Sequence, residues 1–171
     1  MAALFPNETN IYIVDSGTAG SALASSNAVT TEVTNFSVSG GARDVEAVPV
    51  FGNAFIDKEL PREQYEISMD VVCSYSNAVR WEALVMGGDI SSTSAESSAE
   101  PSLKRLFIEA TDGSNYKTMA MDNCRGITMD GEMSADEYWK GTINFKFSPM
   151  DSSANSNLKI AKAAASTSFF D

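Results

Sequence analysis

Histidine is absent from this chain of 171 residues, and cysteine is scarce. The missing histidine removes the commonest general base and the commonest metal ligand of proteins. The two cysteines, Cys73 and Cys124, are far apart in the sequence, and neither belongs to a C-x-x-C pair that would indicate a thiolate zinc site. We therefore expect two free thiols that are buried as small apolar groups.

Long apolar runs are also missing. No segment approaches the roughly 20 consecutive apolar residues that span a bilayer as a helix. The amino-terminal sequence MAALFPNETN has neither a basic region nor a long apolar core, so it lacks the features of a secretory signal. We expect a protein that is made and used without secretion by that route and that has no membrane partner.

Basic residues are few. Twelve Lys and Arg stand against 23 Asp and Glu, which gives a net charge of −11. The first 100 residues hold 14 acids and 4 bases, whereas the remainder holds 9 acids and 8 bases. A groove that grips phosphates needs clustered Lys and Arg, so this excess of acids argues against one. Two interpretations stay open: solubility, or a surface that must not adhere to a polyanion.

Catalytic motifs are missing as well. The sequence has no phosphate-binding loop, no dinucleotide fingerprint and no nucleophile elbow. Carboxylate pairs such as Glu66/Asp70 and Asp130/Glu132 resemble those of hydrolases. Acids two or four positions apart, however, are also what a solvent-facing strand produces without catalysis. The sequence predicts no enzymatic activity, no cofactor and no metal.

The pattern that is present is that of β-structure. In the stretch 63–75, Tyr65, Ile67, Met69 and Val71 alternate with polar residues, and similar alternation recurs along the chain. Helical spacing of apolar residues occurs at 77–86, before a pair of glycines that would end a helix. The sequence predicts a mainly β fold, a two-sheet β-sandwich or partly open barrel with one flanking α-helix and extended arms and loops.

The predicted organisation has three parts. An amino-terminal arm, a first strand and a flexible connection occupy 1–28, a β-sandwich domain occupies 29–149, and a carboxy-terminal arm with a possible short helix at 158–165 occupies 150–171. Within the domain we expect a bulge near Thr34 and Asn35 and a hairpin turn at Gly40-Gly41. A loop at 52–60, the helix at 76–88 and a Ser-rich loop at 89–102 follow.

A family resemblance appears within 36–75. The matching features are the strand, Gly-Gly and RDVE turn that ends at Glu46, the VFG sequence at 50–52, and the strand PREQYEISMDVV at 61–72. This stretch resembles the tail tube proteins (major tail proteins) of long-tailed bacteriophages, and the later helix and strands fit the same layout. Contractile tails and type VI secretion tubes share that fold.

The resemblance implies partners and a place. It implies hexameric rings of the chain itself, stacked into a tube whose lumen holds the tape measure protein and then viral DNA. It also implies tail terminator and tail tip proteins at the tube ends. The location would be the virion tail, assembled in the host cytoplasm. The tube would act as a conduit for DNA ejection.

The predicted site residues serve two purposes. Carboxylates that face the lumen would repel phosphates within a Debye length of about 8 Å. The candidates for that face are Glu66 and Asp70, then Glu32, Asp130 and Glu132. An alternative is that these acids face outer solvent. The candidates for contacts between subunits are Phe55, Ile56, Asp57 and Lys58 in the loop, and Phe5, Phe169 and Phe170 in the arms.

Other interpretations remain open. A head or tail decoration protein, another virion β-sandwich or a type VI secretion-like tube protein would have similar patterns. A carbohydrate-binding module is a weaker alternative, because such modules present several exposed aromatic residues on one face. Here Tyr65, Trp81, Phe107 and Phe145 belong to apolar series instead.

Overall fold

A computed structural model describes residues 9–23, 28–43, 45–50, 54–59, 62–95, 102–111, 115–132 and 138–163. The strands are β1 (Thr9–Asp15), β2 (Val33–Gly40), β3 (Val45–Val50), β4 (Ala54–Glu59), β5 (Tyr65–Cys73), β6 (Lys104–Thr111), β7 (Tyr116–Glu132), β8 (Trp139–Phe147) and β9 (Leu158–Ala163). The helices are the 3-10 turn η2 (Gly20–Ala22) and α1 (Tyr75–Met86). The predicted mainly β fold with one flanking α-helix is confirmed.

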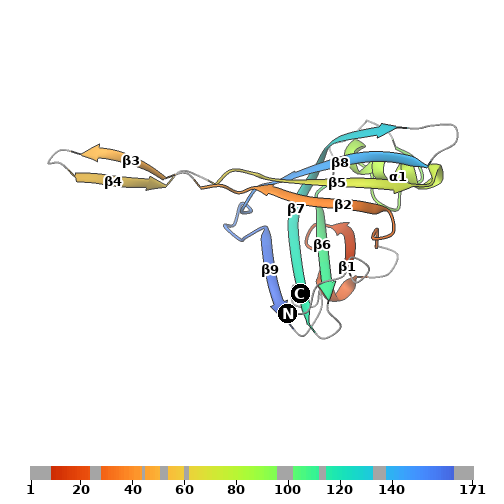
Figure 1. Ribbon diagram of the computed structural model, residues 1–171, viewed down its shortest axis with the longest axis horizontal. Coiled ribbons are helices and arrows are strands. Elements are labelled where there is room, and N and C mark those ends of the chain that lie inside the picture. The colour runs from red at the N-terminus through yellow and green to blue at the C-terminus, as the bar shows by residue number, and fades with distance from the viewer. Residues whose placement is uncertain are drawn as a thin grey trace.

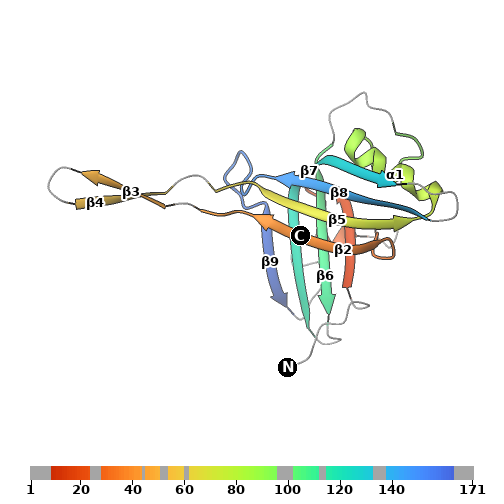
Figure 2. The same ribbon diagram turned by 45° about the horizontal axis from the view of Figure 1, so that its top comes forward.

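The long strand β7 belongs to two sheets. Its first half pairs with β6 and β9, which gives sheet A with the order β1-β6-β7-β9. Its second half pairs with β8, which gives sheet B with the order β7-β8-β5-β2. The two sheets run in very different directions in Figures 1 and 2. Asn123, with a φ of 55°, lies where β7 passes from one sheet to the other.

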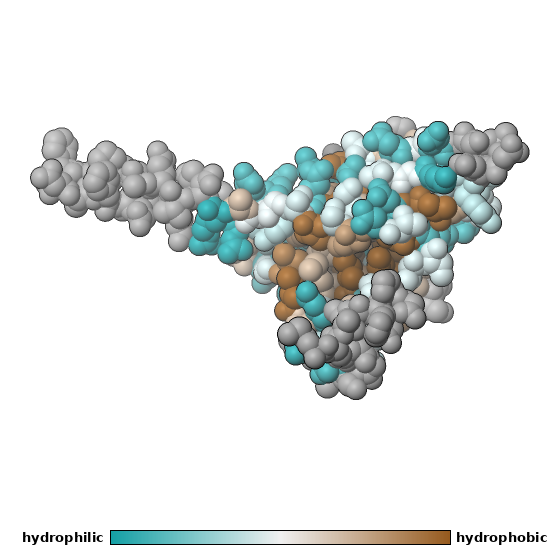
Figure 3. Space-filling view, in the orientation of Figure 1, coloured by the Kyte–Doolittle hydropathy of each residue, from teal (hydrophilic) through white to brown (hydrophobic). Residues whose placement is uncertain are grey.

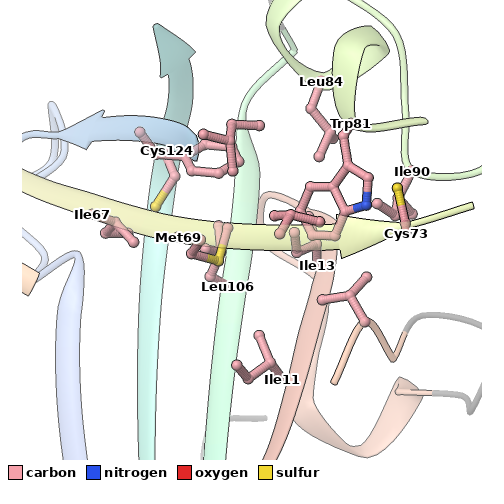
Figure 4. Close-up of a cluster of buried hydrophobic side chains, with 14 of the residues drawn as sticks. Ile11, Ile13, Ile67, Met69, Cys73, Trp81, Leu84, Ile90, Leu106 and Cys124 are labelled. Carbon is pink, nitrogen blue, oxygen red and sulfur yellow. The ribbon is translucent and has the colours of Figure 1, made fainter. Parts of the chain in front are cut away.

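The hydrophobic core lies between the two sheets. In β5 the residues Ile67, Met69, Val71 and Cys73 are buried, as the period-two pattern predicts. Figure 4 shows Met69 beside Leu106 of β6, and Ile67 belongs to the same cluster of buried side chains. Burying a side chain of this size stabilises the fold by about 2 kcal/mol. The alternation of β5 therefore fixes which face of sheet B is available for other contacts.

Helix α1 covers the end of the core near β7 and β8. Its buried residues are Ala78, Trp81, Ala83 and Leu84, and Gly87 ends it in the left-handed conformation with a φ of 108°. The helix approaches β7 closely at Gly126, where a Cβ atom would lie 2.8 Å from the Leu84 carbonyl oxygen. The absence of a side chain at Gly126 thus permits this packing.

The segment between β2 and β5 differs from the prediction. β2 pairs with β5, while β3 pairs with β4, so Gly40-Gly41 does not turn one strand back on its neighbour. Residues 54–59 form β4 and do not form the predicted loop at 52–60. We call the β3–β4 pair the arm, because it projects far from the two sheets in Figures 1 and 2.

Two other local predictions have opposite outcomes. The bulge expected near Thr34 and Asn35 is confirmed by a register shift between Val33 and Asn35. The short helix expected at 158–165 is wrong, since β9 pairs there with β7 along its whole length. Among the described residues, no helix has the length and apolar character needed to cross a membrane.

Candidate assembly surfaces

One face of sheet B carries almost only polar residues, and we call it the polar face. The alternation of β5 places Glu66, Ser68 and Asp70 there, opposite to the core. Strand register aligns them with residues of β8, namely Lys146, Asn144 and Thr142. β7 extends the same rows with Arg125, Thr128 and Asp130, and β2 with Ser39, Ser37 and Asn35. The polar face therefore crosses four strands.

Charged groups of both signs occur in these rows. The Lys146 Nζ atom lies 3.6 Å from Glu66 Oε2, and both side chains are partly exposed. Such an exposed pair contributes little to stability, about 0–1 kcal/mol. The next row is neutral, and in it Asn144 Nδ2 donates to Thr128 Oγ1 at 2.9 Å. Ion pairs and neutral hydrogen bonds thus order the polar face.

Asp70 is held by two donors. Thr142 Oγ1 donates to Asp70 Oδ1 at 2.8 Å, and Asn35 Nδ2 donates to Oδ2 at 3.1 Å. The hydrogen bond from Thr142, followed by that from Asn35, lowers the pKa of Asp70 below its ordinary value. An open groove of about 450 Å³ lies beside it and also borders Asp130 and Glu132. These three carboxylates therefore line one depression on the polar face.

Basic residues balance most of these acids. The four carboxylates are those of Glu66, Asp70, Asp130 and Glu132, and the three basic groups are those of Arg125, Lys140 and Lys146. The described part of the polar face thus carries a net charge near −1, less acidic than the sequence suggested. The alternation of β8 already indicated that Lys146 is on the polar side. Only strand register reveals that it lies opposite Glu66.

Glu32 does not belong to the polar face, so the prediction that groups it with the other acids is wrong. It precedes β2 in a turn and is only 7% exposed. Its carboxylate accepts hydrogen bonds from Trp81 Nε1 and Asn77 Nδ2, both at 2.7 Å, and it forms an ion pair with Arg80. A buried carboxylate needs such partners. Glu32 therefore anchors helix α1 to the start of β2.

Four of the seven predicted contact residues lie in the arm. Phe55, Ile56, Asp57 and Lys58 are consecutive residues of β4. Phe5, Phe169 and Phe170 lie outside the described residues. β3 and β4 pair with each other, and no other strand pairs with either of them in the described part of the chain. The structure thus brings the first four candidates together on a projecting element, separate from the polar face (Figure 1).

Two glycines form the base of the arm. Gly40 and Gly41 have φ angles of 88° and 72°, which favour glycine. A Cβ atom at Gly40 would meet the Gln64 carbonyl oxygen at 2.2 Å, and one at Gly41 would meet the ring of Tyr65 at the same distance. The Tyr65 ring in turn stacks on Phe147 with 5.0 Å between ring centroids. The arm thus leaves sheet B through a closely packed joint.

Asp122 holds the bend of β7. It pairs with Arg105 of β6, and Ser16 Oγ donates to its Oδ1 atom at 2.6 Å. Burial raises the pKa of Asp122, but hydrogen bonds from Arg105, Ser16 and the Asn123 backbone N–H outweigh burial and lower it overall. The backbone of Asp122 also donates to the Asn157 carbonyl oxygen at 2.8 Å, just before β9. This cluster therefore joins three segments of sheet A at the point where β7 leaves it.

The two thiols are free and buried, in agreement with the sequence. Burial, reinforced by the charge of Glu32, raises the pKa of Cys73 to about 11, and burial also raises that of Cys124. Both groups are thus neutral thiols at physiological pH and poor nucleophiles. In the part of the chain that the structure describes, no group of three or more acidic or cysteine side chains is arranged to hold a metal ion.

Comparisons with known proteins reveal the fold but not a family. No protein-family profile matches the chain, and no curated protein matches it. Three solved structures are similar over 95% of this chain. The anti-feeding prophage cap, described as a tube-terminating cap, has a TM-score of 0.56 and 10% identity over 93% of its own chain.

The other two come from an extracellular contractile injection system called PVC. The chain of its sheath/tube terminator in the extended state has a TM-score of 0.53 and 10% identity over 97% of its length. The chain of its sheath-tube complex in the extended state has a TM-score of 0.52 and 12% identity over 93% of its length. At such low identity these matches show a shared fold alone.

Proposed function

We propose that this chain is a structural, non-enzymatic component of a phage-like tail tube, in which copies of it form hexameric rings that stack. The observation that carries this proposal is the combination of a continuous polar face with an arm that projects from the same two strands. A tube subunit needs a wettable lumen surface and a separate element that contacts other subunits. β2 and β5 would provide both.

Three further features support the proposal. The similar solved structures are components of tube-containing assemblies. β2 is an edge strand of sheet B, and pairing with another copy would remove this exposed edge. The described part of the polar face has little net charge, with four acids against three bases, so a nucleic acid cargo would meet no large excess of basic groups to bind there. Partners in the lumen would be the tape measure protein and viral DNA, and the particle would be assembled in the host cytoplasm.

A second candidate is a tube terminator. It is favoured by the names of two of the similar structures, a tube-terminating cap and a sheath/tube terminator. Both candidate functions require that the chain forms a ring. They differ in whether further rings of the same chain are added to it. A tube-forming subunit adds rings at both faces, whereas a terminator forms one ring that caps an existing tube. The partners of a terminator would be the last ring of a tube and the surrounding sheath.

Electron microscopy of the purified protein tests the proposal. We expect stacked rings for a tube-forming subunit, and single rings that do not stack for a terminator. A chain that remains monomeric at high concentration, with and without a tail initiation complex, would contradict both.

Removal of the arm is a second test. Gly40 lies directly opposite Tyr65, so the residues between them can be replaced by a two-residue Asn-Gly turn, which leaves a short hairpin in place of the arm. This variant should fold and should not stack, whereas deletion of residues 97–99 should leave assembly unchanged.

A further inference from the structure

A row of apolar side chains crosses sheet A on its core side and becomes exposed at one end. Strand register aligns Ile11, Ile108, Met119 and Ile160 from β1 to β9. Ile11 is 6% exposed, the two middle residues are partly exposed, and Ile160 is 56% exposed. In Figure 3 hydrophobic residues gather in this region below β2. The exposed end of the row lies on the edge strand β9.

Two lysines border the exposed end. Lys117 and Lys162 lie opposite each other on β7 and β9, and both are exposed. Each is two residues from a member of the apolar row, so each is on the same face of its strand. The surface formed by Met119, Ile160, Lys117 and Lys162 is therefore apolar at one end and basic at the other. We call it the β9 surface.

The arm has the complementary pattern. Phe55, Asp57 and Glu59 stand at alternate positions along β4, with the apolar residue toward the tip of the arm and the acidic residues toward its base. The spacing from Phe55 to Asp57 equals the spacing from Ile160 to Lys162, two residues along a strand. A two-stranded hairpin is only marginally stable by itself, so the arm needs a surface to pack on. The arm projects away from both sheets, so the described elements of its own subunit do not provide such a surface (Figure 2).

We propose that the arm of one copy docks on the β9 surface of a second copy, with Phe55 against Ile160 and Asp57 beside Lys162. This inference rests on the proposed function. It goes further by naming the β9 surface as the place on the second copy where the arm binds. Burial of Ile160 and ordering of the arm would occur in the same step. The acidic character of the chain favours a second copy as the partner for a surface with two exposed lysines.

Cross-linking between differently substituted copies tests the contact. One preparation carries Phe55→Cys and the other Ile160→Cys, and the two are mixed with a copper–phenanthroline oxidant. The native thiols are buried and have raised pKa values, so they contribute little background. Met150→Cys is the matched control, because Met150 is 52% exposed and lies outside the β9 surface. We expect about tenfold more disulfide-linked dimer with Ile160→Cys than with Met150→Cys, since docking raises the local thiol concentration.

A charge exchange tests the register. Lys162→Asp should reduce assembly, and Asp57→Lys should do the same. The two changes combined in one chain should restore assembly, because the opposite charges then meet again. Stacked rings without the 55–160 cross-link and without charge rescue would overturn this inference and leave the proposed function intact. A monomer without the cross-link would overturn both. A cross-link of Ile160→Cys to Phe169→Cys and not to Phe55→Cys would assign the β9 surface to the carboxy-terminal segment instead.

Discussion

Polar side chains connect the segments at the bend of β7, where the two sheets meet. Asp122 and Asn123 lie side by side at the bend of β7, and Asn123 Nδ2 donates to Asn157 Oδ1 at 2.8 Å. Asn157 is buried and donates to the Ser148 carbonyl oxygen at 2.9 Å, which extends the network to the segment after β8. The positive φ of Asn123 is one that asparagine tolerates better than most residues. The bend thus depends on a few polar residues.

Asp122→Asn should destabilise the protein at neutral pH by about 2–3 kcal/mol, because Arg105 loses its counter-charge in a partly buried site. The pKa of Asp122 is lower in the folded protein than the unfolded value of about 3.9. Its contribution is therefore complete above the unfolded pKa and is lost as the pH falls through the folded pKa. Urea unfolding measures the free energy of unfolding of Asp122→Asn and of the natural protein at pH 7 and near pH 2. The difference between the two proteins should be smaller near pH 2. An equal difference at both pH values would contradict this.

Gly141→Ala should destabilise the fold by about 1–3 kcal/mol through overpacking. A Cβ atom there would lie 2.5 Å from Cη2 of Trp139, whose side chain is buried. Trp139→Phe in the same chain removes the clashing ring atoms but not the Asp130 carbonyl oxygen, which would lie 2.8 Å from this Cβ atom. We therefore expect the double variant to lose less than the sum of the single losses, while some loss from position 141 remains. Chemical unfolding of the four chains measures this coupling. If the losses of the two single variants simply add, the Trp139 ring does not restrict the size of the side chain at position 141.

At the scale of elements, helix α1 is held by the polar contacts of Glu32 as well as by apolar packing. Glu32→Ala leaves Trp81 Nε1 without its acceptor and Arg80 without its counter-charge. We expect a loss of about 3 kcal/mol. Glu32→Gln keeps an acceptor oxygen and is the control, with a smaller loss. Urea unfolding followed by near-ultraviolet circular dichroism of the tryptophans should rank the chains in that order. Equal losses for both variants would show that the charge and not the acceptor matters.

Elements with a complete local pattern could be predicted from the sequence. The alternation of β5 and the helical spacing before Gly87 correspond to elements of the structure. β9 was missed because Leu, Ala and Lys have good helix propensity, and its pairing with β7 overrides that preference. β4 was missed because its sequence, AFIDKE, has no period-two alternation: two adjacent apolar residues are followed by three adjacent charged ones. Pairing over distance is not encoded in local periodicity.

The candidate site was predictable to a similar extent. Glu66, Asp70, Asp130 and Glu132 were assigned to one face from alternation, and strand register brings them together. Glu32 was misplaced because the alternation of β2 was extended into residues that form a turn. The balance between acids and bases was also missed, since it depends on which strands are neighbours. Alternation separates two faces of one strand, whereas the charge of a surface is a property of the whole sheet.

At the scale of the whole molecule, the net charge of −11 is not concentrated on the polar face. If this face lines a tube, its near neutrality would let a polyanion pass without adhesion or strong repulsion. Changing Glu66 and Asp70 to Lys turns four acids and three bases into two acids and five bases, a net charge near +3. A lumen of that charge should bind DNA through its phosphates, with an affinity that falls steeply as salt rises.

We therefore expect rings of Glu66→Lys/Asp70→Lys to form normally, to retain DNA at low salt and to impair ejection in an infectious particle. Electron microscopy measures ring formation, and a filter-binding titration at several salt concentrations measures DNA retention. Glu82→Lys/Asp151→Lys makes the same change in net charge away from the polar face, on α1 and in the segment before β9. If both double variants retain DNA equally, total charge is responsible and the polar face does not line the lumen. Retention by the first variant alone would place these rows of β5 and β8 along the path of the cargo.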